Sequence, residues 1–173
     1  MNSVAHGALR LARPVITSLL VLNSLYALGI AGLVAFSFSH PEWYAYLGFF
    51  GDVPHNGFLI GMRAIMAIGL AGAVLTHVVL ARLRAVVDTV RLGDPFTLDN
   101  ARRLSLIAWC LLAGQGLHLA VVAIADAVSR PTYWLDFGSA FTIAPWLAVL
   151  LLFVLARVFA EGARMRADLE GTV

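Results

Sequence analysis

The chain has 173 residues, of which 61% are hydrophobic and only 13% charged, with a formal net charge of +2 at pH 7. That is too little polar surface to cover a soluble domain of this size, so the composition excludes an ordinary soluble protein and favours a lipid bilayer. The one cysteine, Cys110, leaves no partner for an intramolecular disulfide.

Four apolar stretches are long enough to cross a hydrocarbon core of about 30 Å as helices. They cover about residues 15–38, 58–81, 104–125 and 141–158. The connections are too short for a second domain, so we predict one all-α domain over residues 1–173. It is a polytopic membrane protein with four transmembrane helices in an up-down bundle. The first stretch is longer than the apolar core of a signal peptide, so we interpret it as an uncleaved span.

The distribution of arginines predicts the orientation. Ten of the twelve basic residues, all of them arginine, fall at the N-terminus, in the central connection of about residues 82–103, or along the end of the fourth span and the tail of about residues 159–173. By the positive-inside rule, both termini and the central connection are predicted to be cytoplasmic. The arginines lie where topology alone would place them, so we predict no direct binding of nucleic acid.

The central connection has the pattern of a tight turn between two helices. An apolar stripe over residues 83–90 continues the second helix beyond the membrane, and Gly93 is placed to end it as a left-handed cap. Pro95 prevents the helix from resuming, Thr97 suits the N-cap of the next helix, and Asn100 would be its third residue. We therefore predict a rigid cytoplasmic turn that forms a platform with the tail.

The same turn contains the predicted docking residues. Arg102 and Arg103 serve either as topology anchors alone or also as contacts for an acidic face of a partner. The full docking set is Gly93, Asp94, Pro95, Phe96, Thr97, Asn100, Arg102 and Arg103.

Polar residues inside the spans suggest a second candidate site. Arg63 and His118 lie at similar predicted depths, and Gln115 is one turn from His118, so the three could share one intramembrane polar site. The alternative is that Arg63 extends to the interface and His118 is a packing residue. His77 lies at another depth, which argues against a haem between two histidines, and we predict no cofactor and no metal.

The two outer connections are rich in aromatic residues. They form either an aromatic belt at the membrane interface or a shallow pocket for an apolar ligand. The residues concerned are Trp43, Tyr44, Tyr46, Phe49, Phe50, Tyr133, Trp134 and Phe137, with His40 and His55 nearby as a weak zinc candidate. No motif of a known enzyme class is present, so we predict a non-enzymatic protein.

Two segments resemble a bacterial four-span membrane family catalogued as domain of unknown function 2975. The segment "GDPFTLDNARRL" follows its G-x-PFT-x-x-NA-x-RL pattern, and the tail "FAEGARMRADLEGTV" is similar to its F-x-x-G ending, with Gly171 as a departure. The tail residues Glu161, Gly162 and Asp168 therefore join the predicted site. The resemblance implies a multi-pass protein of the bacterial inner membrane. It also implies a partner, because family members are often encoded beside a small helix-turn-helix regulator.

These observations predict a signalling or regulatory membrane protein whose turn and tail engage a cytoplasmic helix-turn-helix transcription regulator. The alternatives are a small transporter or channel-like subunit that uses the intramembrane polar residues, and a structural accessory protein. A homo-oligomer is compatible with all three.

Overall fold

The computed structural model describes residues 2–40, 42–43, 56–129, 138 and 142–170, and this part of the chain is helical without any strand. The four helices are α1 (Asn2–Ser39), α2 (Asn56–Arg91), α3 (Leu98–Val128) and α4 (Ile143–Glu170). Each contains a segment long and apolar enough to cross a bilayer. The predicted all-α, four-span architecture is confirmed.

The helices extend beyond the predicted spans. α2 continues to Arg91, and α4 continues to Glu170, so the tail is a direct extension of the fourth span. At 1.5 Å per residue, the part of α2 beyond residue 81 adds about 15 Å. This agrees with the predicted projection of the second helix.

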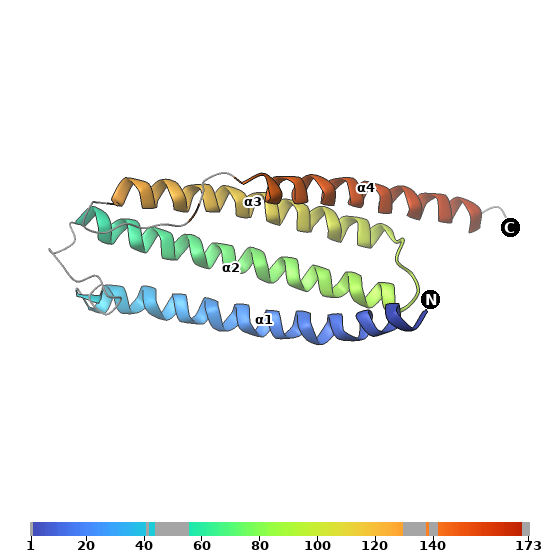
Figure 1. The fold of residues 1–173 in the computed structure, drawn as a ribbon, viewed down its shortest axis with the longest axis horizontal. Helices are drawn as coiled ribbons and strands as arrows, with labels where there is room; N and C mark the ends of the chain where they lie inside the picture. Colours follow the sequence, from blue (N-terminus) through green and yellow to red (C-terminus); the bar gives the residue numbers. More distant parts are fainter. Residues whose placement is uncertain (1, 41, 44–55, 130–137, 139–141, 171–173) are drawn as a thin grey trace.

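The helices form an open row in chain order (Figure 1). α1 packs on α2, α2 on α3, and α3 on α4, and no other pair of helices makes contact in the described residues. Successive helices run in opposite directions, so the N-terminus, the α2–α3 turn and the end of α4 lie at one end of the molecule (Figure 1). We call this the arginine end.

α4 is displaced along the row. The ring of Trp109 on α3 meets that of Phe153 on α4 edge-on, with 5.2 Å between centroids. Counted from this pair towards the arginine end, α4 is six residues longer than α3. α4 therefore projects past the start of α3 by roughly 9 Å, at 1.5 Å per residue, as Figure 1 shows.

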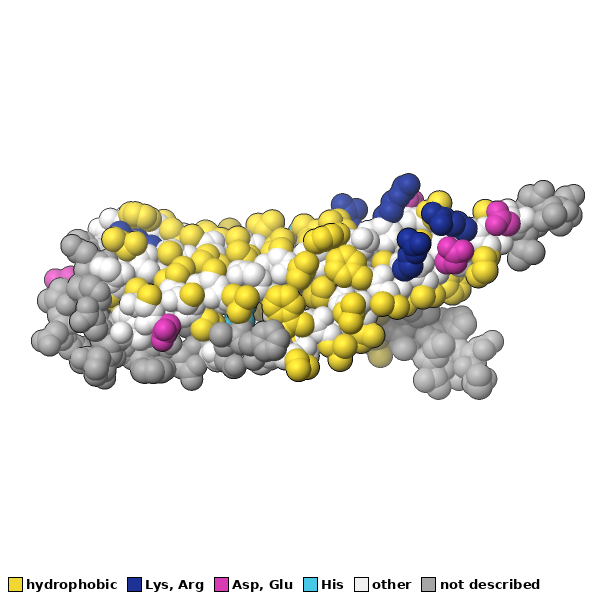
Figure 2. All heavy atoms as spheres, turned by 90° about the horizontal axis from the view of Figure 1, so that it is seen from above, with side chains coloured by type: hydrophobic (Ala, Val, Ile, Leu, Met, Phe, Trp, Pro, Cys, Tyr) yellow, Lys and Arg dark blue, Asp and Glu magenta, His cyan; other side chains and the backbone are white. Residues whose placement is uncertain are grey.

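Burial is concentrated where α3 has neighbours on both sides. Leu104, Ile107 and Ala108 are buried near its start, whereas most large apolar side chains of α1 and α4 are exposed. Apolar side chains run along the visible face of the molecule, and charged ones gather towards the arginine end (Figure 2). An apolar exterior of this kind is stable only in contact with lipid or with another apolar surface.

Candidate functional site

The α2–α3 turn begins with a Schellman motif. Gly93 has φ +86°, and its N–H donates to the Val90 carbonyl at 3.1 Å, while the Asp94 N–H donates to the Thr89 carbonyl at 3.2 Å. These are the 5→2 and 6→1 bonds of a helix that ends in a left-handed residue. The predicted role of Gly93 is confirmed.

The next helix begins at the predicted N-cap. Thr97 has extended backbone angles, and its side chain accepts a hydrogen bond from the Asn100 N–H at 3.1 Å. Asn100 is the third helical residue, as predicted, but its side chain is fully buried. It is therefore a structural residue of the turn and presents no docking surface.

The Asn100 side chain connects the end of α2 to the start of α3. Its Nδ2 donates to Thr89 Oγ1 at 2.7 Å and to the Pro95 carbonyl at 2.9 Å. Its Oδ1 accepts a hydrogen bond from Arg103 Nη1 at 2.8 Å. Both N–H groups and the oxygen of the amide are thus satisfied, which makes the turn a specific, closed polar network.

The two adjacent arginines differ in environment. Arg103 is half-buried and belongs to the Asn100 network. Arg102 is exposed and lies 3.5 Å from Asp99, which is also exposed. Of the pair, only Arg102 offers its charge to a partner.

The end of α4 packs on this turn. The Phe96 and Phe159 rings lie 5.1 Å apart between centroids. A Cβ at Gly162 would be 3.1 Å from Phe96 Cδ1, so the ring lies directly against the helix backbone. Arg166 Nη1 forms an ion pair with Asp94 Oδ1 at 2.5 Å. The predicted contact between turn and tail is present.

We call residues 93–100 and 159–166 together the turn–tail platform. It has a hollow of about 420 Å³ bordered by Asp94, Phe96, Arg102 and Arg166. Leu92, which directly precedes Gly93, and Met165 on α4 are largely exposed, at 85% and 58%. Of the predicted tail residues, Glu161 lies 3.7 Å from Arg164, and Asp168 is exposed.

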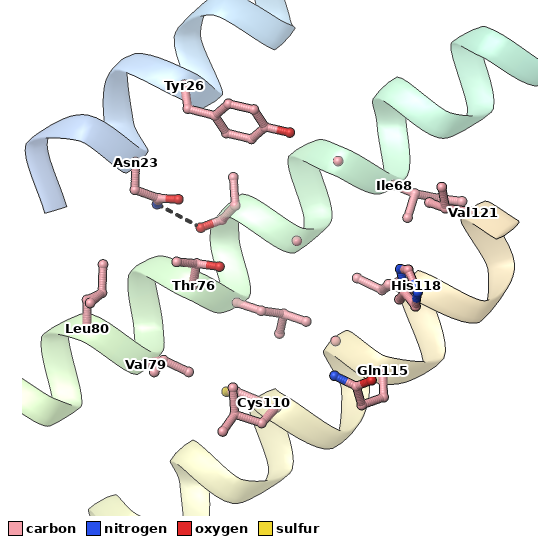
Figure 3. Close-up of a pocket in the computed structure, with 17 residues that line it drawn as sticks. Asn23, Tyr26, Ile68, Thr76, Val79, Leu80, Cys110, Gln115, His118 and Val121 are labelled. Carbon is pink, nitrogen blue, oxygen red and sulfur yellow. Dashed lines mark hydrogen bonds between the residues drawn. The ribbon is translucent and has the colours of Figure 1, made fainter. Parts of the chain in front are cut away.

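A second site lies between α1, α2 and α3, within the apolar part of the row. It is a cleft of about 470 Å³, which we call the membrane cleft. Most of its lining is apolar, and its polar residues are Asn23, Tyr26, Thr76, Gln115 and His118. Figure 3 shows Gln115 and His118 on α3 across the cleft from Asn23 and Tyr26 on α1. Asn23 Nδ2 donates to the Ala73 carbonyl at 3.0 Å, which fixes α1 against α2.

Arg63 is not part of this cleft. Its Nη2 donates to the Ser37 carbonyl at 2.6 Å, and its guanidinium lies 4.3 Å from the centroid of the Phe38 ring. α1 ends at Ser39, so Arg63 binds one of the last carbonyls of that helix, where a cation is favourable. The structure therefore brings Gln115 and His118 together and places Arg63 elsewhere, as an intramolecular cap.

The outer connections fall mostly outside the described residues. This applies to Tyr44, Tyr46, Phe49, Phe50, His55, Tyr133, Trp134 and Phe137. Within the described part, Trp43 is buried at 1% exposure, and His40 stacks on Phe36 with 4.2 Å between ring centroids. Trp43 is thus a packing residue and not part of an exposed aromatic belt.

Sequence reasoning missed Thr89 and Tyr26. Nothing in the spacing of the sequence indicated that Thr89 would meet Asn100 or that Tyr26 would face the membrane cleft. It placed Asn100 correctly in the chain but expected it at the surface.

Comparison with known families identifies the chain. Residues 37–173 match the model of a family described as protein of unknown function (DUF2975). The chain belongs to this family. No curated protein and no solved structure matches the chain. The two segments that resemble the family in sequence are the two that form the turn–tail platform.

Proposed function

We propose that this DUF2975 protein is a membrane-embedded regulatory partner, and that its turn–tail platform binds a cytoplasmic helix-turn-helix transcription regulator. The observation that carries the proposal is the direct packing of the turn on the tail through Phe96 and Gly162, supported by the Asp94–Arg166 ion pair. Segments far apart in the chain thereby form one ordered surface. Such a surface has little conformational entropy to lose when a partner binds.

The composition of the platform also suits a protein partner. Leu92 and Met165 expose apolar side chains at the end of the molecule where arginines are concentrated. The hollow of the platform is bordered by Asp94, Arg102 and Arg166 together with Phe96 and Leu98, so charges of both signs lie beside apolar side chains. Interfaces between proteins commonly combine these elements.

Capture from native membranes tests the proposal. The wild-type protein, expressed in its host and crosslinked before extraction, is expected to retain a helix-turn-helix protein. The double variant Leu92→Gln with Met165→Gln should lose it, because the apolar anchors are removed without disturbing a buried contact. The control is Leu11→Gln, which changes a residue that is 67% exposed at the same end but lies on α1. Retention of no such protein, or equal retention by all three proteins, would contradict the proposal.

A second candidate function is transport of a small molecule, which the membrane cleft favours because Gln115 and His118 converge there. The two candidates differ in which residues they require. For a transporter, Gln115→Leu with His118→Leu abolishes activity and the platform variant is neutral, whereas a regulator shows the reverse. The phenotype of these two variants in the host distinguishes them.

A further inference from the structure

A groove between α3 and α4 lies next to the platform and extends towards the apolar part of the two helices. It has a volume of about 480 Å³, and we call it the arginine groove. Small side chains provide the space, since Ala101 and Ser105 on α3 face Ala156 and Ala160 on α4 across it. At its apolar end is Phe153, whose ring meets that of Trp109.

Three arginines border this groove. Arg157 and Arg164 are seven residues apart on α4, which places them on one face about 10 Å apart at 1.5 Å per residue. Arg102 lies on the opposite wall, on α3. Three arginine side chains from two helices thus border one concave site.

The positive charge is not neutralised locally. Arg102 and Arg164 each have one carboxylate neighbour, at 3.5 and 3.7 Å, and all four side chains of these pairs are at least 60% exposed. Such exposed pairs contribute little and exchange readily for another anion. Arg157 has no carboxylate within ion-pair distance in the described part of the chain. The groove therefore has an excess of positive charge.

The position of the groove identifies the chemistry of its ligand. It extends from the Trp109–Phe153 pair, at the end of the apolar run of α4, to Arg164 in the charged tail. Trp109 is 59% exposed beside it, which provides an apolar surface on the lipid side. A soluble anion would make no favourable contact with this apolar end. A phospholipid has both a phosphate for the arginines and an acyl chain for the apolar end.

We propose that the arginine groove binds one anionic phospholipid. The phosphodiester lies among Arg102, Arg157 and Arg164, whose planar forks match phosphate oxygens. An acyl chain extends from there over Phe153 and Trp109. Basic pockets between membrane helices bind anionic headgroups through this combination of charge and apolar wall. This proposal does not depend on any soluble partner.

The test measures lipid retention by native mass spectrometry. The protein is purified in detergent with an equimolar mixture of phosphatidylglycerol and phosphatidylcholine, and the wild type is expected to retain one phosphatidylglycerol. Arg157→Gln with Arg164→Gln should weaken this binding roughly 30-fold, given a contribution of about 1 kcal/mol from each arginine near an anionic headgroup. The matched control is Arg82→Gln with Arg91→Gln, which removes the same charge from exposed positions on α2.

A third variant separates the groove from the charge. Ala160→Leu fills the groove without changing any charge, so it should also displace the lipid. Equal losses in the two double variants, or normal retention in Ala160→Leu, would overturn the proposal. Inorganic phosphate that displaces the lipid completely at millimolar concentration would show a phosphate site instead of a lipid site.

Discussion

At the scale of single residues, Asn100 explains why the α2–α3 turn has a defined geometry. A buried amide is costly unless all its polar groups are paired, and here Thr89, Pro95 and Arg103 pair them all. A different path of the turn would leave this amide unpaired. The Asn100 network thereby selects one conformation and adds to the stability that packing provides.

Replacement of Asn100 should therefore be costly. Asn100→Ala removes three hydrogen bonds, one of them to a charged group, and should lower the free energy of unfolding by about 3 kcal/mol. Thr97→Ala removes the N-cap bond alone and should cost only about 1 kcal/mol. Thermal unfolding of both variants in detergent measures the difference. Equal costs would mean that the Asn100 network adds nothing beyond the cap.

Arg63 illustrates a different use of a polar residue in an apolar helix. Arg63→Met keeps the apolar stem but loses the charged hydrogen bond to the end of α1, so it should cost about 2 kcal/mol. Arg82→Met is the control, because Arg82 is exposed on the same helix. The comparison is made by melting the two purified variants. If they melt together, the Ser37 contact carries no net stabilisation.

At the scale of helices, the contact between the turn and α4 depends on the absence of a side chain at Gly162. Alanine there would gain helix propensity of up to about 1 kcal/mol over glycine, and Phe96 would have to shift by only a few tenths of an ångström. A β-branched residue leaves no such margin. The Phe96 ring would then have to move away from α4, and the rest of the α2–α3 turn would move with it.

We therefore expect Gly162→Ile to release the tail from the turn. Trypsin should then cut after Arg164 and Arg166 several-fold faster than in the wild type, because the released helix frays more often. Ala148→Ile is the control, since it adds the same side chain at an exposed position on α4 away from the turn and the cleavage sites. Unchanged proteolysis of Gly162→Ile would show that the Phe96 contact does not hold the tail.

At the scale of the whole molecule, the open row leaves α1 and α4 with one neighbouring helix each among the described residues. Their outward faces are apolar and exposed, so lipid or another apolar surface must cover them. The row also brings the N-terminus, the α2–α3 turn and the end of α4 to one end (Figure 1), which is where the platform and the arginine groove lie. The orientation of that end in the membrane therefore decides whether a cytoplasmic protein can reach the platform.

Cysteine labelling determines this orientation. In a Cys110→Ala background, cysteine at Ser39 should react with an impermeant maleimide added to intact cells, because the excess of arginine at the other end is expected to stay inside. Cysteine at Leu92, which is 85% exposed, should react only after permeabilisation. The opposite pattern would remove the support for a cytoplasmic partner at the platform.

The sequence by itself determined the four helices, the turn and its caps. Apolar runs of span length admit few structures in a bilayer other than helices, and Gly93, Pro95 and Thr97 act through local backbone geometry that needs no tertiary information. The tertiary structure alone decided how polar residues from different helices pair. Asn100 meets Thr89 and Arg63 meets Ser37 because of the rotation and stagger of neighbouring helices, which long apolar faces leave open in the sequence. The same freedom concealed the arginine groove, whose residues come from α3 and α4 and are brought together only by the packing of these two helices.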